Sequence, residues 1–483
     1  MRRAWWLLLA LSLCVAFLFQ GTRGLYETTE GRYAEVAREM VAGGNWLVPH
    51  LDGHPHWTKP PLTYWSIGAG LIALGRNAWG VRLFEAIALV AATFSLGVLG
   101  AAMWDELTGW LAALIFVTTP FAVMGANAVS PDLLLACWEV MAVCCLWLAL
   151  RRREHSGRWV TGMWTAFGFA FFTKGPPGLL PLAAILVYAF VQRRRGRTLP
   201  RLANPVGLLL FVLIGFGWYL VCVAREPSLL GYFLGSEVWG RVATDMHHRN
   251  ARWYMPVVIF GLPLLVGLGA WLVTGIMDVR VCSRPGGFRA TVRDAWHNHV
   301  TQFLLLWFFV PLVIFCMAKS RLPLYVLPLV PAQALVLARL AVRALGRDRA
   351  VRRCWRIAVV SAVVLVGAKV VAARVSSPKN MLPLSRQIRA LGADHVTVID
   401  NDKLYGLEFY LDGALHHTTS SELSTELTAT GERLAAHTTH SEIYIAGKYA
   451  PALLARRCRD GSFRCRVEAN PHFQLWVLQA NTE

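Results

Sequence analysis

The chain has 483 residues, of which 55% are apolar and 16% are charged, and this composition is typical of a protein with many membrane-spanning helices. So apolar a composition excludes an intrinsically disordered protein. A net charge of +19 would suggest nucleic-acid binding in a soluble protein, but here the arginines are concentrated in short gaps between apolar runs, which argues against that class.

The first apolar run, residues 4–20, follows Met-Arg-Arg and is interpreted as an uncleaved span because it lacks a small-x-small cleavage site. Several apolar runs approach the roughly 20 residues that a bilayer about 30 Å thick requires. Spans are predicted at residues 4–20, 80–103, 108–126, 133–150, 160–172, 175–192, 205–224, 254–276, 301–317, 322–342 and 356–373. The predicted fold class is therefore an α-helical polytopic membrane protein with about 11 to 13 transmembrane helices, since residues 60–75 and 160–192 are ambiguous.

The arginine-rich gaps predict the orientation of the chain, because Lys and Arg accumulate in cytoplasmic loops. Four such gaps fall on one side, at residues 151–158, 193–201, 280–293 and 343–356. The N-terminus is then cytoplasmic and the C-terminal tail lies on the outer side. The loops expected to share that outer side are 21–79, 127–132, 173–175, 225–253 and 318–322.

The long outer loop, residues 21–79, is unusually polar for this chain. Apolar and charged side chains alternate at helical spacing over residues 31–41, which predicts an amphipathic helix on the membrane surface that ends at Gly43-Gly44. Pro60-Pro61 then precedes a second apolar segment that could also be an interfacial helix. The alternative is a connecting loop without a function.

The composition changes near residue 376, which divides the chain into a transmembrane domain, 1–375, and a soluble domain, 376–483. Within the second part a helix is predicted at 420–438, and short strands are predicted at 395–400, 405–411, 441–447 and 473–478. This pattern indicates a small α/β domain, to which no catalysis is assigned. Cys458 and Cys465 flank a turn in it and could form a disulfide; the pairing stays open.

Five segments, taken in order, resemble a known family. They are "EGRYAEVAREMVAGGNWLVPHLDGHPHWTKPPLTYW" (30–65), "SPDLLLA" (130–136), "FFTKGPPGLLPL" (171–182), "SEVWGR" with "HHRNARWYMPV" (236–257) and "AKSRLPLYVLPLVPAQAL" (318–335). Together they resemble the C-type superfamily of membrane glycosyltransferases, in particular the family that contains the bacterial lipid A 4-amino-4-deoxy-L-arabinose transferases, which is related to the protein O-mannosyltransferases. The resemblance ends near residue 345.

The resemblance implies an inverting glycosyltransferase of a bacterial inner membrane. Such an enzyme moves a sugar, here an amino sugar, from a polyprenyl-phosphate donor to a lipid acceptor, a lipid A phosphate, at the periplasmic face. Two alternatives remain open: a protein O-glycosyltransferase that uses the same kind of donor, and a non-catalytic lipid carrier or flippase. Membrane lipids are the only other partners expected, and nucleic acid is not one.

The resemblance also implies which acids are catalytic. Glu30 matches the acidic motif of the first outer loop, but Thr29 stands where the family has an Asp, so Glu30 or Glu27 would substitute as the base. Asp132 matches the second acidic site, and its alternative role is helix capping. Thr58 replaces another acid. A chain with fewer acids suits a phosphate acceptor, which is already ionised and requires no strong base.

Cations near the outer ends of the spans could neutralise the donor phosphate as the sugar departs. The predicted phosphate-binding residues are Lys59, Lys174, Arg321, Tyr325, Arg241 and Arg249. For a single Lys or Arg the alternative is contact with lipid headgroups.

No cofactor or metal site is predicted with diagnostic spacing. His247 and His248 are weak candidates for a divalent metal, because adjacent residues of a regular helix cannot both face one ion. Glu85 and Glu139 lie near or within spans; Glu85 could pair with Arg82, and neither acid is predicted to be catalytic.

Overall fold

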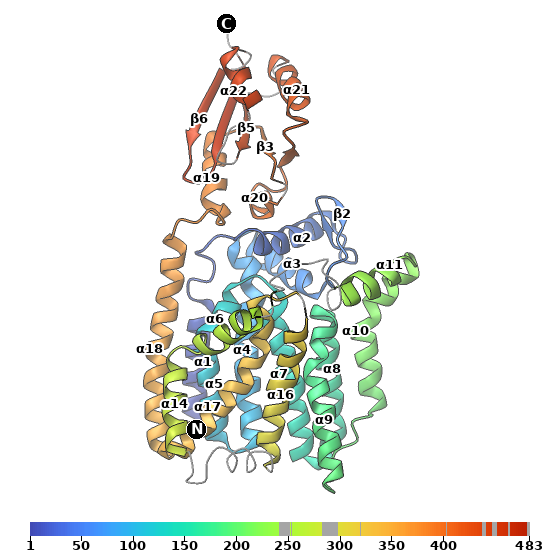
Figure 1. Cartoon of the computed structure of the whole chain (residues 1–483), viewed down its shortest axis with the longest axis vertical. Helices are drawn as coiled ribbons and strands as arrows, with labels where there is room; N and C mark the ends of the chain where they lie inside the picture. The colour runs from blue at the N-terminus through green and yellow to red at the C-terminus, as the bar shows by residue number, and fades with distance from the viewer. Residues whose placement is uncertain are drawn as a thin grey trace.

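The computed structural model describes residues 1–240, 252, 254–282, 298–318, 320–401, 403–436, 441–446, 452–461 and 464–480. Long helices form a bundle, and a small domain with a β-sheet stands at one end of it, joined to the bundle by α18 (Figure 1). The N-terminus lies at the opposite end of the bundle (Figure 1).

The bundle consists mainly of long apolar helices. They are α1 (Arg2–Phe17), α4 (Ala78–Met103), α5 (Glu106–Val117), α6 (Pro120–Asn127), α7 (Pro131–Arg151), α8 (Ser156–Lys174), α9 (Leu180–Arg194), α10 (Pro205–Arg225), α14 (Ala270–Cys282), α16 (His299–Met317), α17 (Val330–Leu345) and α18 (Arg347–Arg374). Within the described residues, seven helices are long and apolar enough to span a membrane, or up to nine if two bent helix pairs each count as one span. The chain is thus a multi-pass membrane protein, as predicted.

The bundle interior is closely packed, and two glycines show how its helices approach one another. A Cβ at Gly100 of α4 would lie 2.7 Å from the Cα of Gly109 of α5, so these helices cross with their backbones nearly in contact. The helix starts are capped as the sequence requires: the side chains of Asn77, Asp105 and Asn298 accept backbone N–H groups of the first turns of α4, α5 and α16.

Two helices of the outer loop lie across the end of the bundle beneath the small domain (Figure 1). These are α2 (Thr29–Gly43) and α3 (Leu62–Leu74), and between them is the hairpin of β1 (His50–Leu51) and β2 (His54–Pro55). The predicted helices at 31–41 and after Pro61 are therefore present. The charged face of α2 is covered, however, since Glu35 and Arg38 are buried and α2 contacts α20 of the small domain.

The small domain contains a five-stranded mixed sheet in the order β4-β3-β5-β7-β6. Its elements are α19 (Met381–Leu391), β3 (His395–Ile399), α20 (Tyr405–Tyr410), β4 (His416–Thr418), α21 (Leu423–Ala435), β5 (Ser441–Ala446), α22 (Ala452–Arg459), β6 (Arg464–Ala469) and β7 (Gln474–Gln479). Strand β3 pairs in parallel with β4 and β5, whereas β7 is antiparallel to β5 and β6.

The small α/β domain is present, but the prediction of a strand at 405–411 is wrong. That segment is the helix α20, whose residues are all buried except Tyr405, and β4 and β6 were not predicted. The open question on the cysteines is resolved, because Cys458 and Cys465 form a disulfide.

One hydrophobic core joins the small domain to the outer loop. Leu25, Tyr33 and Tyr64 from the loop share it with Leu407 and Tyr410 from the small domain. Val129, from the loop between α6 and α7, belongs to the same core. The predicted division between 375 and 376 falls in the segment between α18 and α19, yet the two parts are packed together.

Candidate active site at the outer end of the bundle

Asp132 and Lys174 meet where α7 begins and α8 ends. Ser130 caps α7 and Pro131 is its first residue, so Asp132 lies in the first turn. Helix α8 ends at Lys174 and is followed by Gly175, which has a φ of 74°. The Nζ of Lys174 donates to Oδ1 of Asp132, and the exposed fractions of the two residues are only 8% and 5%. A buried ion pair of this kind is costly to desolvate, so it is a candidate functional site.

Tyr325 completes this cluster from a third element, the 3₁₀ helix η5 (Pro323–Leu329). The Lys174 Nζ lies 4.1 Å from the centroid of the Tyr325 ring, which is cation–π geometry. Arg321 lies just before η5 in the same sequence segment. It is buried and donates to the backbone carbonyls of Cys316 (2.9 Å) and Arg252 (3.3 Å). The structure therefore brings Asp132, Lys174 and Tyr325 together, with Arg321 on the adjoining turn.

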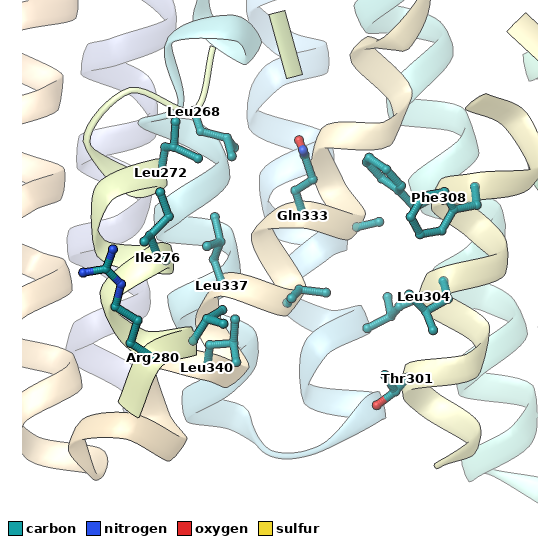
Figure 2. A pocket seen from close by; sticks show the side chains of 16 residues that line it. Leu268, Leu272, Ile276, Arg280, Thr301, Leu304, Phe308, Gln333, Leu337 and Leu340 are labelled. Carbon is teal, nitrogen blue, oxygen red and sulfur yellow. The ribbon is translucent and has the colours of Figure 1, made fainter. Parts of the chain in front are cut away.

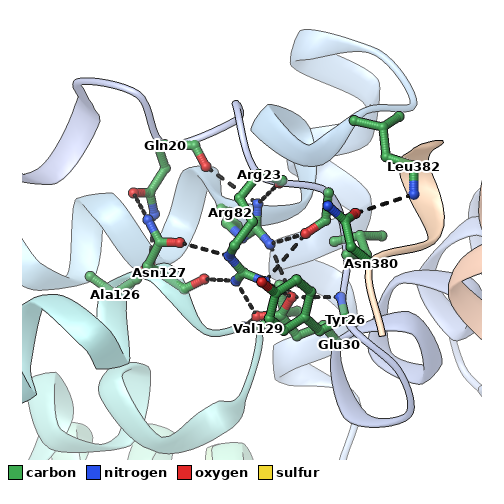
Figure 3. Close-up of polar contacts among 12 residues, drawn as sticks. Gln20, Arg23, Tyr26, Glu30, Arg82, Ala126, Asn127, Val129, Asn380 and Leu382 are labelled. Atoms are coloured by element: carbon green, nitrogen blue, oxygen red, sulfur yellow. Dashed lines mark hydrogen bonds and ion pairs between the residues drawn. The ribbon is translucent and has the colours of Figure 1, made fainter. Parts of the chain in front are cut away.

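Glu30 lies in a network of polar contacts that reaches Val129, three residues before Asp132 (Figure 3). Arg23 contacts both of its carboxylate oxygens, at 2.6 and 3.0 Å, and Arg82 of α4 donates to Oε2 at 3.0 Å. The backbone N–H groups of Tyr26 (2.9 Å) and Val129 (3.3 Å) also donate to Glu30. Burial alone would raise the pKa of Glu30, but Arg82 and Arg23 hold that pKa below its ordinary value, so the carboxylate is charged and fully bonded.

Glu27 lies apart from the Asp132–Lys174 pair. Its Oε1 accepts the backbone N–H groups of Gly406 (2.6 Å) and Leu407 (3.3 Å) at the start of α20, so it contacts the small domain. Burial raises the pKa of Glu27 to about 8, despite these two hydrogen bonds, and its Oε2 has no hydrogen-bond partner among the described residues.

The helices α2 and α3 pack on each other, and α3 also contacts α8, the helix that ends at Lys174. The ring centroids of Tyr33 in α2 and Tyr64 in α3 are 5.4 Å apart. Burial, and to a smaller extent the neighbouring Tyr64, raises the pKa of Tyr33 well above its ordinary value. Asp132 and Tyr325 also raise the pKa of Tyr33, to a smaller extent. Lys59 is half-buried in the segment between β2 and α3.

The remaining predicted residues are placed less directly. Arg241, Arg249, His247 and His248 lie outside the described residues. In the part of the chain that the structure describes, no group of three or more His, Cys, Asp or Glu side chains is arranged to hold a metal ion.

Sequence reasoning missed Arg23, Arg82 and Tyr33. The two arginines carried a signal, because each is a charged residue beside or within an apolar run. Arg82 does not pair with Glu85, as one interpretation had it, but with Glu30. Tyr33 lies within the amphipathic helix predicted at residues 31–41, and a hydroxyl on the apolar face of that helix is the feature that could have identified it.

An apolar groove of about 640 Å³ runs between α14, α16 and α17 (Figure 2). Leu268 and Gln333 lie toward one end, and Arg280, Thr301 and Leu340 lie toward the other (Figure 2). The end at Gln333 is the one nearer the cluster, since α17 follows η5 directly and Phe315 of α16 packs on Tyr325 with ring centroids 6.1 Å apart. The walls of the groove therefore lead toward the Asp132–Lys174 pair.

Comparison with known proteins gives three kinds of match. The family model described as dolichyl-phosphate-mannose-protein mannosyltransferase matches residues 58–221. The undecaprenyl phosphate-alpha-4-amino-4-deoxy-L-arabinose arabinosyl transferase of Erwinia tasmaniensis is 31% identical over 332 residues, which are 67% of this chain and 57% of that protein. The protein of the same name from Pseudomonas savastanoi pv. phaseolicola is 31% identical over 355 residues, which are 72% of this chain and 63% of that protein. The chain thus spans less than two thirds of these relatives.

Solved structures share the fold. The crystal structure of ArnT from Cupriavidus metallidurans bound to undecaprenyl phosphate matches with a TM-score of 0.72 and 20% identity, over 98% of this chain and 97% of that one. The Archaeoglobus fulgidus oligosaccharyltransferase matches with a TM-score of 0.52 and 13% identity, over 85% of this chain and 64% of that one.

Proposed function

Since the chain has the fold of the C-type membrane glycosyltransferases and is related in sequence to aminoarabinose transferases, we propose that it transfers an amino sugar from a polyprenyl phosphate to a phosphate of lipid A. The observation that carries this proposal is the buried Asp132–Lys174 pair with Tyr325, near one end of an apolar groove. A charged pair beside a lipid-sized groove suits a substrate that has an ionised head and an isoprenoid tail.

Lys174 is the proposed ligand of the donor phosphate. When the bond between the sugar and the phosphate oxygen breaks, negative charge accumulates on the leaving polyprenyl phosphate, and a buried ammonium stabilises that charge. The Tyr325 ring and Asp132 hold Lys174 in place until the donor arrives. Lys59 and Arg321 are proposed to add positive charge at the same end of the bundle, together with Arg241 and Arg249.

Asp132 is the proposed acid at the reacting centre. Glu30 has four groups bonded to its two oxygens, and Glu27 contacts the small domain, so neither is as well placed to take a proton. A lipid A phosphate is already ionised and attacks the sugar without losing a proton, with inversion at the anomeric carbon. In that case Asp132 orients Lys174; with a hydroxyl acceptor it would act as the base.

The groove between α14, α16 and α17 is proposed to hold the isoprenoid tail. Its lining is almost wholly apolar, and its long axis runs along the helices from Gln333 to Arg280. A groove open on the flank of the bundle admits a lipid from within the bilayer, which favours lipid substrates over soluble ones.

The proposed location is the inner membrane of a bacterium, with the site and the small domain in the periplasm. The arginine-rich segments support this orientation: α7 ends at Arg151, α9 at Arg194 and α17 near Arg343, all at the end opposite the small domain (Figure 1). The N-terminus lies at this arginine-rich end and is proposed to be cytoplasmic (Figure 1).

A second candidate is transfer to a protein hydroxyl, which the description of the matching family model favours. A purified protein in vesicles that contain lipid A and an undecaprenyl-phosphate amino sugar separates the two. We expect lipid A to gain the mass of the amino sugar, and Lys174→Met and Asp132→Asn to reduce that gain at least about 100-fold, because buried charge stabilisation of this kind contributes roughly 3 to 4 kcal/mol.

The control for these variants is Lys403→Met, which removes an exposed lysine of the small domain and should leave transfer unchanged. Unmodified lipid A together with a glycosylated peptide would replace the first proposal by the second. Movement of the donor lipid without any sugar transfer would indicate a carrier and exclude both.

A further inference from the structure

We propose that the small C-terminal domain positions the active site, through a joint between α20 and residues 24–30 of the outer loop. Tyr410 and Glu27 are the positioning residues of this joint. The inference rests on the proposed sugar transfer, and it gives a function to a domain to which the sequence assigned none.

The joint begins with backbone pairing between the outer loop and the segment before α19. The N–H of Glu27 donates to the carbonyl of Lys379 at 2.9 Å, and the N–H of Met381 donates to the carbonyl of Leu25 at 3.2 Å. Tyr26 and Asn380 form the antiparallel bridge between these two bonds (Figure 3). The loop is therefore held by backbone pairing as well as by side chains.

Two side-chain contacts from α20 reinforce the pairing. The hydroxyl oxygen of Tyr410 accepts the N–H of Leu25 at 3.0 Å, and both groups are buried. In the opposite direction, Glu27 of the loop accepts the first N–H groups of α20, from Gly406 and Leu407. Each part thus satisfies backbone donors of the other, and breaking the joint leaves buried donors unpaired.

The same loop is bonded to the segment that carries Asp132. Three residues beyond Glu27, Glu30 accepts the N–H of Val129, while Arg23 donates to the carbonyl of Asn127 at 2.9 Å. Ser130 and Pro131 then lead into α7 and Asp132. A chain of contacts therefore runs from the Tyr410 hydroxyl to the N–H of Leu25, and along the backbone to Tyr26, whose N–H donates to Glu30. Glu30 in turn accepts the N–H of Val129, three residues before the proposed catalytic acid; Figure 3 shows the part from Tyr26 to Val129.

The test compares Tyr410→Phe with Tyr444→Phe in the full-length protein. Tyr444 belongs to the same domain and is fully buried, and its hydroxyl bonds Thr430 at 2.7 Å. Its ring belongs to a different hydrophobic cluster from the one that contains Leu25 and Tyr410. Both variants lose one buried hydroxyl, so a general loss of domain stability should affect them equally. Only Tyr410→Phe removes the contact to the loop.

The rate of amide hydrogen exchange measures the stability of these contacts directly, and the measurement does not require enzyme activity. We expect Tyr410→Phe to raise exchange about three- to tenfold in peptides that cover 24–31 and 126–132, as the loss of one buried hydrogen bond predicts. Glu27→Ala removes the acceptor of the Gly406 and Leu407 N–H groups, so it should raise exchange in the same peptides. Tyr444→Phe should leave exchange in these peptides unchanged. The rate of sugar transfer at saturating donor should fall by a similar factor in the first two variants only.

Unchanged exchange at 126–132 in both joint variants would overturn the inference, as would an equal loss of transfer in Tyr444→Phe. The outcome for the proposed function is separate. If the wild-type protein transfers no sugar but the exchange pattern appears, the path exists and the assigned activity is wrong. If transfer occurs and the pattern does not appear, only the positioning inference fails.

Discussion

Glu30 shows how one buried carboxylate can hold a membrane site together. It faces Arg23 and Arg82, of which Arg82 is wholly buried, and no other acid in the described residues forms an ion pair with either. Removing the charge of Glu30 would leave two buried guanidinium groups without a counter-charge, which is far costlier than loss of a surface ion pair.

Glu30→Gln is therefore expected to lower stability by about 3 to 5 kcal/mol, the usual result of removing one partner from a buried ion pair. Thermal unfolding in detergent measures the effect, and Glu154→Gln, an exposed acid in the loop between α7 and α8, is the control. If Glu30→Gln unfolds like the wild type but abolishes transfer, Glu30 acts in the chemistry rather than in this network.

The sequence identified individual residues of the candidate site better than it identified which residues form ion pairs with them. Motif resemblance selected Asp132 and Lys174, and the positions of these residues at span ends indicated a common side of the membrane. Their direct pairing, and the pairing of Glu30 with Arg82 across 52 residues, depend on how α4, α7 and α8 pack. Periodicity contains no information about such contacts.

Among the elements, α2 and α20 pack so closely that α2 requires a glycine at residue 31. A Cβ at residue 31 would lie 2.8 Å from the Cα of Gly406 and still closer to its backbone nitrogen, where no flexible side chain can move aside. The segment 405–411 was predicted as a strand because its apolar residues fit either period. The first turn of α20 is instead stabilised by Glu27, which accepts the N–H of Gly406 from 379 positions away in the sequence. A local sequence pattern cannot reveal so distant a contact.

Gly31→Ala should accordingly push α20 away from α2 and destabilise the joint by about 1 to 3 kcal/mol, the cost of overpacking. Gly43→Ala in the same helix is the matched control: a Cβ there meets nothing within 4 Å, so only helix propensity changes, slightly in favour of the variant. Limited proteolysis between α18 and α19 reports the difference. Equal resistance of the two variants would show that the approach of α2 and α20 can relax.

For the whole molecule, hydropathy and arginine placement sufficed to predict the fold class, because a bilayer admits few solutions other than bundled helices. They did not reveal that the small domain and the outer loop share one hydrophobic core. Two acids stand at the joint beside this core: Glu27, which is half-buried, and Glu408, which is buried. Burial raises the pKa of Glu27 to about 8, and burial together with Glu35 and Asp52 raises the pKa of Glu408 in α20 to about 9.

These two raised pKa values make the docking of the small domain depend on pH in a defined direction. A folded state that keeps protons which the unfolded chain releases near pH 4.5 loses stability as the pH rises. The contribution of Glu27 is therefore complete below about pH 4.5 and is lost by about pH 8, and that of Glu408 is lost by about pH 9. Thermal unfolding followed from pH 5 to pH 9 should show a falling midpoint. Replacing both acids by Gln, which is neutral at every pH, should flatten the curve, whereas the exposed Glu432→Gln should not; a curve that stays steep in the double variant would assign the pH dependence to other groups.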